Sequence, residues 1–568
     1  MKIKPGRFAV AMKEVRRRIV PGIGVLALLF VLLGYVLYPA LTTMLKSLAV
    51  EGGFGVEHYT IFFTSPISLL VLSNTLVLGG LTVLLCGIVG TGLAFLVHYF
   101  ECPYRNLLDK LLLLPVMMPG IIIVFAFVQL YGESGLVTKS IELLFGLDEA
   151  PYSFSGLPGI LFVHIYTQYV YFYLTVSLAI RQIDLSVIES ARILGASRSK
   201  IFVSIILPYL TPAIITSAAV TFMTGMGSFT APSIIGDGYK VLTTQILLSK
   251  ANNFMETAAV QVVILTSVSM IFFALLRWYE KRKLFSGSVK GVPFQPLRIK
   301  STCMRRLATA LKAILVLMIL LPFITIIVLS FVDSASWMVS VYPQEFSLDN
   351  FTTVLSRARK FRPFKNSIEM SLLAAFICLL VAVPSSWIIE KTKLKVKGLI
   401  EFLVILPWAM PASAIAINII IANSKPTIFS LNTVLVGTYI LLPLGYFIKS
   451  LPIVVRITHI SFQGLNSTLL EASRSLGASG LRTFRKVALP IIYPGLLAGF
   501  LYVFVRCIGE YTISAFLYTA SNKPISIAMV NAIFEYDIGL AMAYGTLLIA
   551  LTVCLSTILS KINPLDGH

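Results

Sequence analysis

The chain has 568 residues, of which 57% are hydrophobic and 12% are charged, and its mean hydropathy is +0.89. Soluble domains carry about a quarter charged residues, so this composition excludes an ordinary soluble protein and indicates an integral membrane protein. The formal net charge of +21 does not indicate nucleic-acid binding. Basic residues of multispan proteins gather on cytoplasmic loops beside anionic lipid, so the expected partner is the bilayer.

Apolar stretches long enough to cross roughly 30 Å of hydrocarbon recur along the whole chain. Backbone groups in lipid must be bonded internally, and the stretches lack strand-like alternation, so we expect helices. We therefore predict an all-α integral membrane protein with about twelve transmembrane helices. The predicted spans are 21–46, 69–98, 107–131, 157–180, 203–229, 257–278, 308–331, 367–389, 400–422, 433–453, 487–515 and 539–559.

Basic residues orient these spans, because positively charged loops stay on the cytoplasmic side. They cluster before the first span and between the sixth and seventh, and an even number of spans separates the two clusters. We therefore expect both clusters, and both chain termini, in the cytoplasm. The loop after the third span carries four carboxylates and a single lysine, which suits the outside. The two clusters are Lys2, Lys4, Arg7, Lys13, Arg16, Arg17 and Arg18, and Arg277, Lys281, Arg282, Lys283, Lys290, Arg298, Lys300, Arg305 and Arg306.

One basic segment does not follow this orientation. It lies before the eighth span, where the loop is expected outside. Two interpretations are open: a solvated amphipathic stretch that stronger neighbouring signals override, or a patch that docks an acidic lobe of an external partner protein. The segment comprises Arg357, Arg359, Lys360, Arg362 and Lys365.

Two landmarks show that the chain is duplicated. The sequence LPVMMP at 114–119 returns as LPWAMP at 406–411, 292 residues later, and ESARILGAS at 189–197 returns as EASRSLGAS at 471–479, 282 residues later. The difference of ten residues predicts a shorter external loop in the second half. Six spans in each half give two parallel repeats with a substrate path between them. We expect a basic cytoplasmic N-terminus at 1–20, a first half at 21–280, a cytoplasmic linker at 281–305 and a second half at 306–568.

A short polar segment follows the fourth span of each half, at 189–208 and 471–490. Each has a glutamate, a glycine six residues later and a Leu-Pro pair that ends nineteen residues later. We predict a short surface helix that the glycine ends, followed by a span that the proline opens. An amphipathic loop on lipid headgroups is the alternative, but two copies with identical spacing favour a helix that receives force from a soluble ATPase. The residues assigned to this coupling are Glu189, Ser190, Ala191, Gly195 and Pro208, with Glu471, Ala472, Gly477 and Pro490.

In this scheme, Glu189 and Glu471 anchor the helix N-termini or pair with the ATPase, and Ala191 and Ala472 permit close approach. The two segments resemble the EAA signature of binding-protein-dependent ABC importer permeases, with Ser190 and Ser473 in place of alanine and Val487 in place of isoleucine. The resemblance extends to the proline pairs and to Asn74-Thr75 and Asn366-Ser367 at the second spans.

This resemblance implies a type I importer permease in which each EAA helix contacts one ATPase subunit. It also implies the other components: two copies of that subunit, which hold ATP and Mg, and an extracytoplasmic substrate-binding protein. The expected location is the bacterial cytoplasmic (inner) membrane. We expect no cofactor in this chain and no enzyme activity of its own, since nothing in it resembles the ATP-binding pattern GxxxxGK[ST].

The fifth spans align GMGSFTAP at 225–232 with CIGEYTIS at 507–514. Glycines there thin the helix, so we assign Gly227, Ser228 and Gly509 to the translocation path. Arg506 and Glu510 lie four residues apart in an apolar span, which is costly unless they pair or face water. They form either a structural ion pair or part of the path.

The fused layout and the GSFTAP and GEY segments most resemble the ferric-iron branch of the family, so ferric iron is the favoured substrate. Aminoethylphosphonate, thiamine and polyamine importers use the same machinery and are alternatives. A secondary transporter driven by an ion gradient also uses two six-span halves, but it needs no matched EAA segments. Co-purification with an ATPase separates these two classes.

Overall fold

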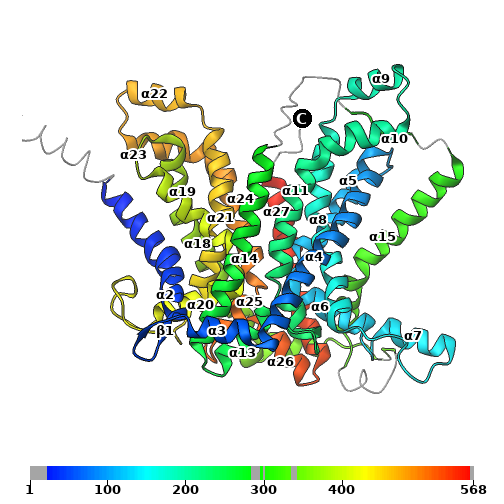
Figure 1. The fold of residues 1–568 in the computed structure, drawn as a ribbon, viewed down its shortest axis with the longest axis horizontal. Helices are drawn as coiled ribbons and strands as arrows, with labels where there is room; N and C mark the ends of the chain where they lie inside the picture. The colour runs from blue at the N-terminus through cyan, green and yellow to red at the C-terminus, as the bar shows by residue number, and fades with distance from the viewer. Residues whose placement is uncertain (1–21, 283–293, 299–300, 334–341, 344, 563–568) are drawn as a thin grey trace, which may run out of the picture.

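The computed structural model describes residues 22–282, 294–298, 301–333, 342–343 and 345–562 (Figure 1). The predicted basic N-terminus at 1–20 and residues 283–293 of the predicted linker lie outside the described residues. The cytoplasmic assignment of the chain termini therefore remains a prediction.

The first half is built from helices and one two-residue β-hairpin, in which β1 (Ala49–Val50) pairs antiparallel with β2 (Gly53–Phe54). Its first span, Gly22–Ser47, includes η1 (Leu33–Leu37) and α2 (Tyr38–Ser47). The remaining elements are α3 (Glu57–Thr64), α4 (Pro66–Ala94), η2 (Phe95–Tyr99), α5 (Arg105–Met117), α6 (Gly120–Tyr131), α7 (Leu136–Phe145), α8 (Gly156–Arg181), α9 (Leu185–Ile193), α10 (Arg198–Ile201), η3 (Phe202–Ile206), α11 (Leu207–Met226), α12 (Thr230–Ile235), α13 (Leu242–Ala251) and α14 (Met255–Arg282).

Among the described residues, the second half repeats the order of the long helices but has no counterpart of the β-hairpin or of η2. Its elements are α15 (Thr302–Leu329), α17 (Asp349–Ser356), α18 (Ala358–Lys391), α19 (Lys397–Ile405), η4 (Leu406–Ala409), α20 (Ala412–Asn423), η5 (Ile428–Ser430), α21 (Leu441–Gln463), α22 (Ser467–Ser475), α23 (Gly480–Thr483), η6 (Phe484–Ala488), α24 (Leu489–Ile508), α25 (Thr512–Leu517), α26 (Ile525–Phe534) and α27 (Ile538–Ile562). The three-residue η5 stands where α7 lies in the first half, in agreement with the shorter loop predicted after the third span.

Ten helices of the described residues are long and apolar enough to cross a membrane, and the bent pair formed by α19–η4 and α20 makes eleven. The fourth predicted span, 157–180, corresponds to α8, which is not among these eleven and whose 26 residues include four tyrosines. Helix α8 packs along α4 and α11, as α21 packs along α18 and α24 in the second half. The prediction of an all-α membrane protein made of two six-helix repeats is thus confirmed.

The prediction that the third span of each half is continuous, at 107–131 and 400–422, is wrong. The chain breaks at the second proline of each proline pair, where α6 and α20 begin after Pro119 and Pro411. A residue before proline avoids helical geometry, and Met118 and Met410 have extended ψ angles of 147° and 127°. In the second half the two pieces meet at 115°.

The tenth span also differs from its prediction at 433–453, because α21 runs from Leu441 to Gln463. Local turn chemistry holds the chain out of a helix before that point. Thr427 and Ser430 form a reciprocal capping box, and Leu431 and Asn432 both have positive φ. An apolar sequence therefore runs through a loop that hydropathy alone does not separate from a span.

The first span of each half packs against the other half. Helix α2 contacts α20, and α15 contacts α5 and α6. Figure 1 shows α2 and α15 on opposite flanks, each beside the half to which it does not belong in sequence. This exchange joins the two repeats into one membrane unit.

The Asn-Thr and Asn-Ser pairs at the second spans have matching structural roles. Asn74 donates to the Lys240 carbonyl at 3.0 Å, and Thr75 accepts from the Leu242 N–H at 2.9 Å. In the second half, Asn366 donates to the Lys523 carbonyl at 3.0 Å, and Ser367 accepts from the N–H of the first residue of α26 at 2.8 Å. Each pair therefore ties its second span to the start of α13 or α26.

The buried core is shared at one end of the molecule and divided at the other. One large cluster contains residues of both halves, including Phe229 and Tyr511. Two smaller clusters lie beneath α9 and α22, around Ile188 in the first half and around Leu470 in the second. Figure 1 shows α9 and α22 at the same end of the molecule on opposite sides, as expected for parallel repeats.

Candidate coupling helices and the interface between the halves

Helices α9 and α22, the candidate coupling helices, begin with matched side-chain caps. The Ser186 N–H donates to the Asp184 carboxylate at 2.9 Å, and the Thr468 N–H donates to the Asn466 amide oxygen at 3.0 Å. Aspartate and asparagine are favoured at this position because they satisfy free N–H groups of the first turn. The predicted role of the EAA glutamates as N-terminal anchors is therefore wrong.

Both coupling helices end in the same turn, as predicted. Gly195 and Gly477 each have φ of +81°, a left-handed conformation that glycine adopts without the steric cost of a Cβ. The next residue closes the turn. The Ala196 N–H reaches the Ala191 carbonyl at 2.9 Å, and the equivalent bond from Ala478 measures 3.1 Å. These bonds form the Schellman motif that commonly terminates helices.

The serine of each GAS triplet then begins the next helix. The Lys200 N–H donates to Ser197 Oγ at 3.3 Å, and the Arg482 N–H donates to Ser479 Oγ at 3.3 Å. The triplet therefore supplies, in order, a left-handed turn, its closing hydrogen bond and the cap of the following helix.

Pro208 and Pro490 are the second residues of α11 and α24, as predicted for prolines that open a helix. The apolar spans nevertheless extend further back, to Arg198 and Gly480. A wide π-helical turn precedes each proline. In the first half the Leu207 N–H bonds the Phe202 carbonyl, five residues back, and the second half repeats the pattern at Leu489. A proline inside a helix clashes with the preceding turn, and a widened turn relieves that clash.

The coupling helices bury one face and present the other to solvent. Ile188 and Leu470 occupy equivalent positions and are buried. Glu189, Ser190, Glu471 and Ala472 are exposed, whereas Ala191 is half-buried against its own half. The two alanines predicted to permit close approach therefore differ in burial, and Ser473, which aligns with Ala191, takes the half-buried position in the second half.

Large apolar side chains project from the ends of both coupling helices. Ile193 and Leu194 are each 86% exposed, and Leu476 is 88% exposed. Exposed apolar residues at a polar end of a membrane protein mark a contact surface. The sequence analysis did not single out these side chains, although Leu194 and Leu476 stand directly before the recognised glycines.

Glycine and proline residues meet across the two halves where the third spans break. Gly509 faces Pro119, so closely that a Cβ built on the glycine lies 2.2 Å from the proline ring. Gly227 faces Pro411, and a Cβ built there lies 3.3 Å from the ring. The predicted path glycines thus contact the prolines that break the third span of the other half.

Two equivalent aromatic residues complete this cross-half interface, which we define as Pro119, Pro411, Gly227, Gly509, Phe229 and Tyr511. Phe229 and Tyr511 stack with ring centroids 5.6 Å apart and planes inclined by 30°. Both rings are buried. Stacked rings at this separation have a favourable aromatic geometry, so the halves meet through a matched contact near their pseudo-twofold axis.

Ser228, also predicted to line the path, belongs to a buried hydrogen-bonded chain. Its hydroxyl lies 2.9 Å from His164 Nε2, and His164 Nδ1 lies 2.8 Å from Thr82 Oγ1. The Ser228 carbonyl accepts from Thr243 at 2.6 Å. This residue therefore connects α4, α8 and α13.

Arg506 and Glu510 do not pair with each other, so the predicted i,i+4 ion pair is wrong. Helix α24 ends at Ile508, so the two residues do not share a continuous helix. Glu510 pairs with Lys449 at 2.5 Å, and its other oxygen accepts from the Ile513 N–H at 2.7 Å, capping α25. Arg506 donates to the Val116 carbonyl of the other half at 3.1 Å. Lys449 was missed because it lies 61 residues from its partner.

Replacing Glu510 by glutamine should lower the Tm of the permease, because it leaves the Lys449 charge without a partner. Breaking a fully buried ion pair costs about 3–5 kcal/mol, and we expect less here because the Lys449 side chain is 36% exposed. Adding Lys449→Met should restore most of the Tm. Melting curves of the two variants and the wild type check this. Equal Tm values for Glu510→Gln and the wild type would contradict it.

Residues 87–284 and 382–564 match the family of binding-protein-dependent transport system inner membrane components. The chain belongs to that family. Each match includes one coupling helix, so the fused double permease of an ABC importer that the sequence predicted is confirmed. Permeases of this family are transport subunits and not enzymes.

Relatives of the permease share much of its length. It is 32% identical over 500 residues to the probable ABC transporter permease protein y4fN of Sinorhizobium fredii, which covers 86% of this chain and 87% of the relative. It is 24% identical over 553 residues to the ferric transport system permease protein FbpB of Actinobacillus pleuropneumoniae, and the alignment covers 93% of this chain and 76% of the relative. The spermidine/putrescine transport system permease protein PotB of Escherichia coli is 32% identical over 229 residues, and the alignment covers 37% of this chain and 78% of the relative.

Proposed function

We propose that this permease forms the membrane path of an importer for ferric iron, delivered by an extracytoplasmic binding protein and driven by two ATPase subunits. The observation that carries the substrate is the alignment with a ferric transport permease over 93% of this chain, through both halves. The polyamine relative aligns with 37% of it. Aminoethylphosphonate and thiamine are the alternative cargoes of the same machinery.

Uptake in vesicles tests the substrate. The permease is reconstituted with the ATPase and the binding protein encoded beside it, with ATP inside the vesicles, and uptake of labelled ferric iron is compared with that of aminoethylphosphonate, thiamine and spermidine. We expect ATP-dependent accumulation of ferric iron alone. Accumulation of another solute without ferric iron would overturn the substrate assignment, and uptake without ATP would overturn the importer mechanism.

The coupling helices α9 and α22 supply the contact for the two ATPase subunits in this proposal. Each has a rigid cap at both ends and an exposed apolar tip, which suits a lever that fits into a cleft of a partner. The face that carries them is then cytoplasmic, with both chain termini on the same side. The cross-half interface, where the two halves meet, serves as the gate that closes the path toward the outside.

The basic segment before the eighth span lies at the external end of α18 in this orientation, because the other end of that helix lies beside α21, shortly before α22. Arg357, Arg359, Arg362 and Lys365 are exposed. Replacing these four residues by glutamine should weaken binding of the loaded binding protein at least tenfold and make that binding less sensitive to salt, because the charges attract an acidic lobe. Unchanged affinity, with normal membrane insertion, would leave the segment as a solvated stretch.

A further inference from the structure

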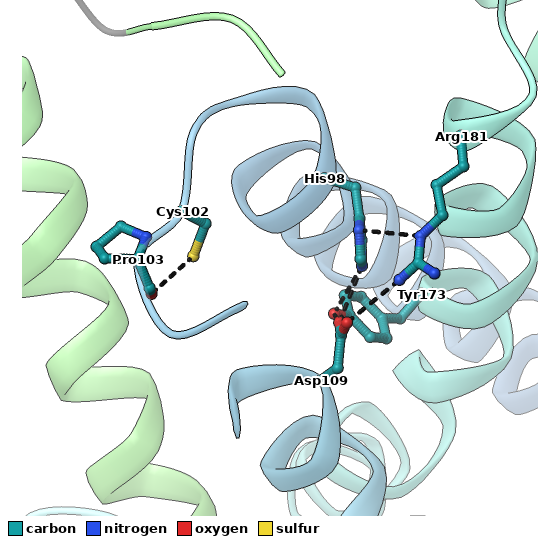
Figure 2. Close-up of polar contacts among 6 residues, drawn as sticks. All are labelled: His98, Cys102, Pro103, Asp109, Tyr173 and Arg181. Carbon is teal, nitrogen blue, oxygen red and sulfur yellow. Dashed lines mark hydrogen bonds and ion pairs between the residues drawn. The ribbon is translucent and has the colours of Figure 1, made fainter. Parts of the chain in front are cut away.

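A cluster of four polar side chains joins three helices at the coupling end of the first half (Figure 2). Its centre is the Asp109 carboxylate on α5. It accepts from His98 of η2 at 2.9 Å, from Arg181 of α8 at 3.2 Å and from the Tyr173 hydroxyl. His98 and Tyr173 are buried. We call these four residues the first junction.

The hydrogen bonds of the first junction determine which nitrogen of the His98 imidazole accepts and which one donates. Arg181 can only donate, and its Nε lies 3.3 Å from His98 Nδ1, so this nitrogen accepts. The proton of the neutral ring is then on Nε2, which donates to Asp109. Arginine and carboxylate provide charge-assisted hydrogen bonds, which are stronger than neutral ones. The junction therefore holds α5, α8 and η2 in one arrangement.

The position of the first junction in the chain connects the coupling helix with the gate. Arg181 is the last residue of α8, and Asp184, the cap of α9, follows three residues later. Asp109 lies in α5, ten residues before Pro119 of the gate. The stiff part of this route runs from Asp109 to Met117, where α5 ends, a rise of about 12 Å, and Pro119 follows two residues beyond that end. Movement of α9 thus has a direct route through Arg181 and Asp109 to Pro119.

The second half has a different cluster at the equivalent place. The repeat offset of 292 residues pairs His98 with Glu390, and the offset of 282 pairs Arg181 with Gln463. Glu390 contacts His459 at 3.0 Å, and Gln463 lies 3.1 Å from the same imidazole nitrogen. These bonds connect α18 with α21.

The third span is not part of this second cluster. Asp109 is matched by Glu401 of α19 at the 292-residue offset, and Glu401 is exposed. In the part of the chain that the structure describes, the side-chain contacts of His459 with Glu390 and Gln463 join α18 and α21 and do not include α19. The second half therefore lacks the polar route from its coupling helix to Pro411.

We propose that the first junction is a mechanical link that transmits the movement of α9 to the gate, and that the two coupling helices are therefore not equivalent. The inference rests on the proposed docking of ATPase subunits on α9 and α22. Helix α9 moves Pro119 through Arg181 and Asp109, whereas α22 moves the second half through α18 and α21. Asp109 is a positioning residue, because it acts on the gate through α5 and does not contact cargo.

The matched variants Asp109→Asn and Glu401→Gln test this link in the reconstituted full transporter, with ATP hydrolysis and uptake measured in the same vesicles. Asp109→Asn should lower the uptake per ATP hydrolysed at least tenfold while ATP hydrolysis stays within twofold of wild type. Glu401→Gln should leave both unchanged. Asp109→Glu, which keeps the charge, should restore more than half of the lost uptake.

Equal coupling ratios for Asp109→Asn and the wild type would overturn the proposal, as would an equal loss in Glu401→Gln. If Asp109→Asn does not assemble, Arg181→Gln replaces it, because it removes the partner on α8 and leaves the α5 carboxylate in place. Failure of the proposed function is distinguishable from these outcomes, because it shows in the wild-type transporter as absence of ATP-dependent uptake. Failure of the link shows only in the variants.

Discussion

Replacing Ile193, Leu194 and Leu476 together by serine should abolish uptake and release the ATPase subunits. The three side chains are 86–88% exposed at the tips of the coupling helices, so the change leaves the fold of the permease intact. Burying a side chain of this size in an interface contributes about 2 kcal/mol. Loss of two such contacts weakens association at α9 by roughly a thousandfold, and loss of one weakens it at α22 by roughly thirtyfold.

Co-purification of the ATPase with the permease, followed by uptake in vesicles, measures this effect. The matched control is Leu143→Ser with Leu144→Ser on α7, where both side chains are also exposed. Figure 1 shows α7 at the end of the molecule away from α9 and α22. The control should retain the ATPase. Retention by the triple variant would show that the apolar tips are not the docking surface.

Gly509→Ala should open the gate without the binding protein. The glycine has φ of −109°, so alanine fits the backbone, and the cost is overlap with Pro119, 2.2 Å from the new Cβ. Overpacking of this kind costs about 1–3 kcal/mol, which shifts an equilibrium between two states roughly 5- to 150-fold. We expect ATP hydrolysis that no longer depends on loaded binding protein, together with reduced uptake.

Gly227→Ala is the matched control, because its Cβ lies 3.0 Å from the Met223 carbonyl oxygen and 3.3 Å from Pro411, a much smaller overlap than at Gly509. ATP hydrolysis of both variants, measured with and without loaded binding protein, gives the comparison. ATP hydrolysis should become much less dependent on the loaded binding protein in Gly509→Ala than in Gly227→Ala. Equal dependence in Gly509→Ala and the wild type would exclude the cross-half interface as the gate.

The features that the sequence predicted well are those that depend on neighbours in the chain. Apolar stretches predicted the spans, and the repeat predicted two parallel halves. The GAS triplet predicted where the coupling helices end, because a left-handed glycine and its flanking bonds involve residues only a few positions apart. Even there, the N-terminal cap was assigned to Glu189 although Asp184 provides it. Hydropathy did not separate helix from apolar loop at 424–440.

Contacts between distant residues required the tertiary structure. A membrane helix that is apolar on all sides carries no period that says which face meets which neighbour. The exchange of α2 and α15, the pairing of Lys449 with Glu510 and the meeting of Gly509 with Pro119 therefore could not be read from spacing.

The sequence by itself determined that this protein is a duplicated membrane permease with a coupling segment in each half, since these features are written in local patterns repeated at two fixed offsets. Only the tertiary structure decided how the halves differ. Asp109 and Glu401 are equivalent carboxylates in the sequence, but the folded chain surrounds Asp109 with three donors and leaves Glu401 exposed. The packing of helices places donors beside one carboxylate and not the other, and so decides which of the two belongs to a hydrogen-bonded junction.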